Sequence, residues 1–221
     1  YAHLQVQSNQ INADVYGDMG WSQFYRELQS QVLAEYLPSV FSASKRAGDV
    51  YLSNQFAFRV DVSSTDSLAK AFSWPISLVD TAHIEGYYYD EKDVFALSIM
   101  ADSLRVQDKV LHQTHLMLDN KAYKTMDLSL STHFPTSKDD FHINVDAKAL
   151  SDTLDMSIQV DLAQGLPFAL SNSRHLFGRD SADMLSCCSK LYVPYVQWKG
   201  ATWQLDTAHV DYVSNRLYVE D

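Results

Sequence analysis

Hydrophobic and polar residues alternate along most of the chain after residue 49, and this period of two is typical of strands with one dry and one wet face. The alternation is clearest in residues 55–63, 94–99, 126–130, 141–148 and 154–162. In the first stretch Phe56, Phe58 and Val60 share one face, whereas Arg59 and Asp61 take the other. The pattern predicts a mainly β fold.

Short polar clusters separate these apolar runs. They lie at residues 90–93, 119–121, 135–140, 151–152 and 214–215. Clusters of Asp, Asn, Ser, Lys and Pro of this kind form tight turns. No sequence repeat is present, but the turns recur at similar intervals. We therefore predict an antiparallel meander of many similar strands, stacked along one axis in an elongated, twisted or curled sheet.

One region departs from the alternation and has apolar residues at three-and-four spacing, which predicts one long amphipathic helix over about residues 20–45. Its apolar positions are Trp21, Phe24, Tyr25, Leu28, Val32, Leu33, Tyr36, Leu37, Val40 and Phe41. Ser22 can cap the helix, and Pro38 kinks or ends its last turns. The predicted organisation has two parts. Residues 1–48 contain strand ends at 4–6 and 11–15 and this helix, which packs on the sheet. Residues 49–221 form the strand-rich curled sheet.

Composition and charge narrow the function. The chain has 221 residues, 46% of them hydrophobic, and a net charge of −11, which argues against a nucleic-acid partner. No window approaches the roughly 18–20 consecutive apolar residues that span a bilayer. The sequence starts without Met or a basic leader, so we expect an excised piece of a longer protein whose anchor is missing.

The sharper catalytic motifs are missing from the sequence, which predicts no enzyme activity, no cofactor and no metal site. His112 and His115 have ligand-like spacing for a helix, but residues three apart in a strand face opposite ways. The pair Asp139-Asp140 is interpreted as a turn. Cys187 and Cys188 are adjacent, so we interpret them as two small semi-buried thiols without a disulfide.

Two further groups of residues have ordinary explanations. His175 with Arg174, Arg179 and Asp180 is interpreted as a solvated connection between apolar runs. The aromatic residues could stack on sugars, which leaves open an extracellular or periplasmic glycan-binding β-module as the alternative function, although aromatic residues also favour strands. These are Tyr87, Tyr88, Tyr89, Tyr192, Tyr195, Trp198, Trp203, Tyr212 and Tyr218.

Two blocks of sequence carry a family resemblance. Residues 54–72, the strand Ile84-Glu-Gly-Tyr-Tyr88 and residues 94–99 follow one another as a strand, a short helical turn and an Ile-x-Gly-x-Tyr strand. Residues 191–205, 208–212 and 216–220 give a Trp-centred strand and a two-strand meander. Over most of residues 49–221 the chain resembles the TamB-like proteins of Bacteroidetes, in the AsmA-like superfamily.

The resemblance implies a parent protein anchored in the inner membrane, with a long periplasmic body that forms an open curled sheet, a β-taco or β-solenoid-like structure with an apolar interior. Its far end would engage an outer-membrane barrel of the TamA or BamA type. Such proteins are associated with phospholipid transport between the membranes and with outer-membrane protein assembly. We expect this chain to be a non-catalytic middle section of such a protein, located in the periplasm.

A trough made from the dry strand faces would bind phospholipid acyl chains, because each buried methylene contributes about 0.8 kcal/mol. The alternative is that the same side chains close a core against one another or against the long helix. The candidate groove residues are Phe56, Phe58, Val60, Phe95, Leu97, Ile99, Leu128, Leu130, Phe141, Ile143, Val145, Met156, Ile158 and Val160.

Overall fold

The computed structural model describes residues 2–18, 33–41, 55–67, 69, 75–89, 94–121, 125–180, 182–214 and 216–220. The elements with defined bounds are β1 (Ala2–Gln7), β2 (Ile11–Asp18), α2 (Ala34–Tyr36), β3 (Gln55–Val62), β4 (Ile76–Leu78), β5 (Ala82–Tyr89), β6 (Val94–Val106), β7 (Lys109–Asp119), β8 (Met126–Pro135), β9 (Asp140–Leu150), β10 (Thr153–Leu162), β11 (Pro167–Arg179), β12 (Leu185–Trp198), β13 (Ala201–Val213) and β14 (Arg216–Glu220).

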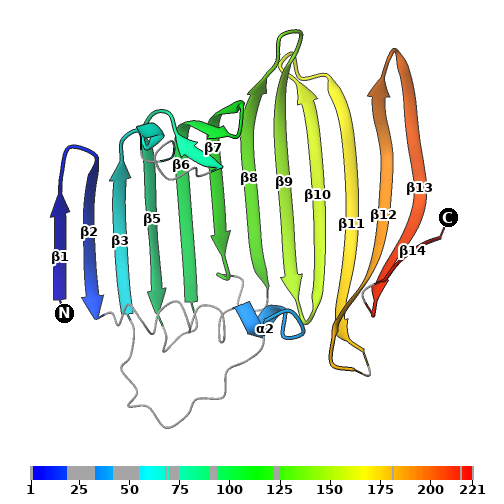
Figure 1. Ribbon diagram of the computed structural model, residues 1–221, viewed down its shortest axis with the longest axis horizontal. Coiled ribbons are helices and arrows are strands. Elements are labelled where there is room, and N and C mark those ends of the chain that lie inside the picture. Colours follow the sequence, from blue (N-terminus) through cyan, green and yellow to red (C-terminus); the bar gives the residue numbers. More distant parts are fainter. Residues whose placement is uncertain are drawn as a thin grey trace.

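The strands form a single 14-stranded sheet in which chain neighbours are also sheet neighbours, from β1 at one edge to β14 at the other. Only β4 lies off this path, paired with β6. Every recorded pairing is antiparallel, and Figure 1 shows the strands side by side with the two termini at opposite ends. The predicted mainly β, antiparallel meander is confirmed. The strand ends predicted at residues 4–6 and 11–15 lie within two complete strands of this same sheet, β1 and β2.

The predicted turns join the strands where the structure describes them. Ser151 and Asp152 connect β9 to β10 with φ angles of 47° and 62°, as a two-residue turn between right-twisted strands requires. Asp139 lies in the connection from β8 to β9, where its carbonyl accepts a hydrogen bond from the Thr136 hydroxyl. The turn predicted at residues 90–93 lies outside the described residues.

The sheet has two chemically different faces. Residues paired directly across strands point to the same face, and neighbours along a strand alternate. The face that carries Phe56, Tyr88 and Phe95 is mostly hydrophobic, and we call it the apolar face. The face that carries Arg59, Glu85 and their cross-strand partners has mostly polar side chains, some of them charged, and we call it the polar face.

The prediction of a long helix over residues 20–45 is wrong for residues 33–41, the part of this range that the structure describes. The helix there is α2, Ala34–Tyr36, and Leu37 has left the helical region with φ −133° and ψ 63°. The residue before a proline is disfavoured in the α region, so Pro38 ends the helix as expected. Residues 19–32 and 42–54 of the prediction lie outside the described residues.

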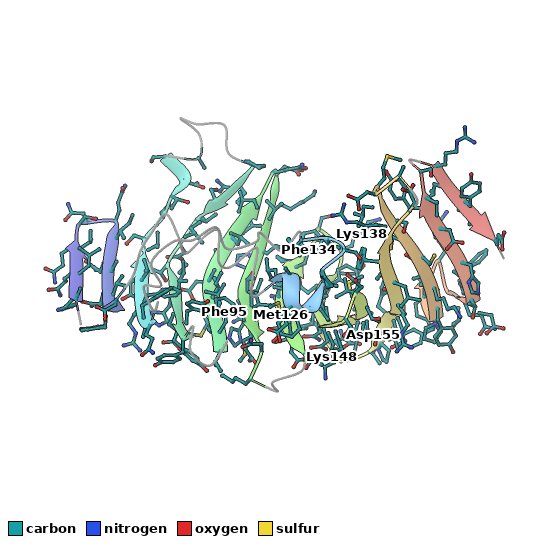
Figure 2. All side chains as sticks on the ribbon, turned by 90° about the horizontal axis from the view of Figure 1, so that it is seen from below. Phe95, Met126, Phe134, Lys138, Lys148 and Asp155 are labelled. Atoms are coloured by element: carbon teal, nitrogen blue, oxygen red, sulfur yellow. The ribbon has the colours of Figure 1, made fainter. Side chains whose placement is uncertain are left out.

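The segment 33–41 packs against one end of the apolar face. Tyr36 is 3% exposed and joins a core with Phe56, Tyr88, Phe95 and Met126. Ala149 is the remaining buried member of this core. Six partly buried residues pack against the core: Leu33, Leu37, Phe58, Leu97, Leu118 and Leu154. In Figure 2 α2 lies near the labelled Phe95 and Met126, at the ends of the strands.

Hydrogen bonds fix this segment to two connections of the sheet. Asn120, which is 2% exposed, donates from Nδ2 to the Tyr36 hydroxyl at 3.0 Å and accepts the Phe95 N–H at 2.7 Å. The Asp152 N–H donates to the Tyr36 carbonyl at 2.9 Å. The Asp152 carboxylate accepts the Ser39 N–H and hydroxyl at 2.7 and 2.8 Å. We call these contacts the Tyr36 clamp.

Replacing Asn120→Ala should destabilise the protein by about 2 kcal/mol, because the buried Phe95 N–H loses its side-chain acceptor and the Tyr36 hydroxyl loses a donor. Urea denaturation of the variant measures the loss. Asn144→Ala, the same change on the polar face of β9, is the control and should cost less than about 0.5 kcal/mol. Equal losses for the two variants would contradict the role given to the clamp.

Candidate functional site

The apolar face brings all the candidate groove residues together. Strand register places Phe58, Leu97 and Leu128 in one row across the sheet, and the row continues to Met156. Alternation along each strand then puts the rest on the same side. The residues that share this face are Phe56, Phe58, Val60, Phe95, Leu97, Ile99, Leu128, Leu130, Phe141, Ile143, Val145, Met156, Ile158 and Val160.

One row on this face is hydrophobic at every strand on the main path from β1 to β10, and we call it the middle row. It consists of Val6, Ala13, Val60, Ile84, Ile99, Leu116, Leu130, Val145 and Ile158. At the usual strand spacing of about 4.8 Å the middle row extends for roughly 38 Å. It is a continuous hydrophobic track perpendicular to the strands.

Most of the apolar face is only partly covered. Among the candidate groove residues Phe56 and Phe95 are buried, at 3% and 4% exposure, and both lie under the segment 33–41. The others, including Leu130 and Ile158, keep part of their surface exposed. The accessible area is 14176 Å², whereas a compact monomer of this mass exposes about 10,300 Å².

Gly86 shows how the face accommodates its aromatic residues. It pairs with Phe58 on β3 and Leu97 on β6, and an added Cβ would lie 2.6 Å from the Ala96 carbonyl and 2.8 Å from the Phe58 ring. The Phe58 ring therefore occupies the space above the glycine. This contact gives a physical reason for the glycine in the sequence Ile84-Glu-Gly-Tyr-Tyr88.

The hydrophobic character of this face changes at β11. Ser171, Ser173 and His175 replace the apolar residues of β10, and His175 bonds through Nδ1 to Ser189 at 2.8 Å and through Nε2 to Ser173 at 2.9 Å. The interpretation of Arg174 and His175 as a solvated connection is wrong, since both lie within β11. Sequence reasoning missed this because β11 has polar residues on both faces and so shows no alternation.

A row of charged side chains crosses the polar face. Asp127, Lys148, Asp155, Arg174 and Lys190 are direct partners on consecutive strands from β8 to β12. Lys148 Nζ lies 3.3 Å from Asp127, and Arg174 binds Asp155 through Nε at 2.6 Å and Nη2 at 2.9 Å. The Arg174 hydrogen bonds hold the pKa of the Asp155 carboxyl below its usual value. In Figure 2 Lys148 and Asp155 lie on the side of the sheet away from α2.

This charged row lies in a hollow of about 790 Å³, which strands β7 to β13 line. Besides the charged row, the residues that line the hollow include Met117, Asp119, Asp146, Asn172 and Tyr192. The alternation of hydrophobic and polar residues does not reveal this hollow. Opposite charges at matching positions of successive predicted strands could have indicated the hollow. Matching these positions requires the register between the strands, which the sequence pattern does not give.

The aromatic residues named as possible sugar-stacking positions divide between the faces. Tyr87 and Tyr89 lie on the polar face with ring centres 5.4 Å apart, and Tyr192 lies there too, in the hollow. By register Trp203 and Tyr212 lie on the apolar face. Tyr88 is 1% exposed in the core.

The remaining candidates are dispersed. His112 bonds Ser103 at 3.1 Å and His115 bonds Ser98 at 3.3 Å, and these serines lie on opposite faces of β6. Cys187 and Cys188 are free thiols, and only Cys187 is partly buried. Within the described ranges, no three His, Cys, Asp or Glu side chains gather closely enough to hold a metal ion. In the same part of the chain no helix has the length and hydrophobicity to cross a bilayer.

The fold and its faces define a class: an open antiparallel meander with one hydrophobic and one polar face. The chain matches no protein-family model, no curated protein and no solved structure.

Replacing Gly86→Ala should destabilise the protein by about 1–3 kcal/mol, because the added methyl group overlaps the Phe58 ring and the Ala96 carbonyl. Thermal or urea unfolding measures the effect. Gly178→Ala, within β11, is the control, since its Cβ would meet only the Ser186 hydroxyl at 3.3 Å. A neutral Gly86→Ala would show that the ring does not occupy that space.

Proposed function

We propose that this chain is a non-catalytic section of an envelope-spanning periplasmic protein, and that its apolar face forms an open β-taco groove for phospholipid acyl chains. The groove would serve phospholipid transport between the inner and outer membranes, outer-membrane protein assembly, or both. The observation that carries the proposal is the middle row, an uninterrupted hydrophobic track with partly exposed side chains such as Leu130 and Ile158.

The dimensions of the track suit an acyl chain. One leaflet of a bilayer has a hydrocarbon thickness of about 15 Å, half of the roughly 30 Å core. The middle row is roughly 38 Å long at normal strand spacing, so a whole acyl chain can lie along it. Each methylene that leaves water there contributes about 0.8 kcal/mol. Binding of this kind needs no catalyst and no directional polar group.

The open groove competes with a closed core, in which the same side chains would be sealed. The described cover lies at the two ends of the face. Segment 33–41 contacts one end row through Phe56, Phe95 and Met126. At the other end Asp66 binds Arg105, and Ala101 and Thr114 are buried. Between these ends, Ile99, Leu130 and Val145 keep exposed surface in the described part of the chain, which favours the groove. An apolar surface of this extent needs a ligand or a partner.

The resemblance of residues 49–221 to TamB-like proteins of Bacteroidetes supports the cellular setting. On that basis the parent protein would be anchored in the inner membrane and would engage an outer-membrane barrel of the TamA or BamA type. The edge strands are compatible with a longer sheet, since among described residues β1 pairs only with β2 and β14 only with β13.

The lipid groove predicts that delipidated protein takes up phospholipid from vesicles of palmitoyl-oleoyl phosphatidylglycerol, measured by native mass spectrometry. Leu130→Gln, in the middle row, should lower the affinity about fivefold, because roughly 1 kcal/mol of apolar contact is lost. Met100→Gln is the control: this residue is 44% exposed but lies on the polar face of β6.

Circular dichroism establishes that both variants keep the sheet, so that a loss of lipid binding is not a loss of fold. No uptake of phospholipid by the delipidated wild-type chain would overturn the proposal. Equal loss of affinity in Leu130→Gln and Met100→Gln would also overturn it, since binding would then not be confined to the apolar face.

A further inference from the structure

Four hydrogen-bonding side chains form a compact quartet on the polar face. Arg174 pairs directly with Lys190, and Asn172 pairs directly with Tyr192, on the neighbouring strands β11 and β12. Direct partners have Cβ atoms about 5 Å apart, and the two pairs are separated by about 7 Å along the strands. All four residues line the hollow of about 790 Å³. We call them the basic quartet.

Asp155 sets the orientation of Arg174 within the basic quartet. It accepts hydrogen bonds from Nε at 2.6 Å and from Nη2 at 2.9 Å, so one edge of the guanidinium is occupied. On the other edge, Nη1 donates no hydrogen bond to any residue that the structure describes. A guanidinium fixed along one edge presents the opposite edge to a planar oxyanion with little further loss of side-chain entropy.

Lys190 gives the quartet an excess of positive charge. Like charges directly opposite each other in a sheet are destabilising, and Lys190 is opposite Arg174 on one side and His209 on the other. No ion pair is recorded for Lys190 among the described residues, whereas Lys148 lies 3.3 Å from Asp127. An anion between Lys190 and Arg174 would offset this repulsion.

The size of the hollow selects the kind of anion. A volume of about 790 Å³ lies within the range of about 300–1,000 Å³ typical of sites for drug-sized molecules, and is far larger than a single phosphate or sulfate needs. The Tyr192 ring is 44% exposed beside the cations, and Asn172 adds an amide. An exposed aromatic ring, a planar amide and fixed charges together suit a ring-shaped, hydroxylated ligand.

We propose that the hollow on the polar face binds a short acidic oligosaccharide whose carboxylate or sulfate lies between Lys190 and Arg174, with a neighbouring sugar ring against Tyr192. The other end of the hollow fixes the orientation of the sugar. Asp119, Asp127 and Asp146 line that end and repel an anion. This site lies on the face opposite the lipid groove and does not depend on the lipid proposal.

Isothermal titration calorimetry of the full chain with trigalacturonate tests the site, with a sulfated trisaccharide, neutral maltotriose and glycerol phosphate as comparisons. One or both acidic trisaccharides should bind, and their affinity should fall as salt is raised. Maltotriose should bind at least about tenfold more weakly, because the charge-assisted hydrogen bonds are absent. Glycerol phosphate should also be weaker, since it leaves most of the hollow empty.

Lys190→Gln should lower the affinity for the acidic trisaccharide about tenfold, through loss of one charged hydrogen bond. Lys148→Gln is the matched control: it makes the same charge change in the same hollow, at the acidic end, and should change affinity less than about twofold. Tyr192→Ala should weaken binding as well. Circular dichroism of each variant confirms that the sheet is intact.

Three results would overturn the site: no binding of either acidic trisaccharide, equal binding of maltotriose, or equal effects of Lys148→Gln and Lys190→Gln. Glycerol phosphate binding as tightly as the trisaccharides would overturn the saccharide assignment, because a single oxyanion would then account for the affinity.

Discussion

A single layer of sheet cannot bury its hydrophobic face against itself, and this constraint governs the whole molecule. Folded domains normally solve the problem with a second layer. Here segment 33–41, fixed by Tyr36, Asn120 and Asp152, covers one end of the strands. At the other end Asp66 binds Arg105, and Ala101 and Thr114 are buried. Much of the rest of the face is left partly exposed, as at Ile99, Leu130 and Val145. Where the described residues provide no second layer, hydrophobic side chains are less buried, and these same side chains form the surface for which a function is proposed.

Register connects the two faces. An antiparallel ladder with nearly unbroken pairing from β1 to β10 aligns hydrophobic residues into rows on one side and, necessarily, the intervening residues into rows on the other. The middle row and the charged row from Asp127 to Lys190 are two consequences of one pairing scheme. At β11 the apolar face becomes polar, while the charged row continues to Arg174 and Lys190. The two faces therefore present their proposed sites over overlapping but different sets of strands.

The strand faces could be predicted from sequence because a period of two leaves each residue only one side to occupy. That is why Phe56, Leu130 and Ile158 were grouped correctly without any knowledge of pairing. The polar residues on the apolar side of β11 and the hollow could not be predicted, since they depend on the register between successive strands and on how the sheet twists (Figure 2). In the described segment 33–41 the predicted helix extends too far, because three-and-four spacing does not indicate where the backbone leaves the helical conformation, which here happens at Leu37 before Pro38.

The central claim, an apolar face open to acyl chains, is tested most directly with a photoreactive phenylalanine at each of two adjacent residues of β8. Leu130 lies in the middle row, and Ser129 lies on the polar face. After illumination in phosphatidylglycerol vesicles, mass spectrometry should find phospholipid adducts with the probe at 130 and few or none with the probe at 129. Equal labelling at both positions, or labelling at 129 alone, would contradict the account.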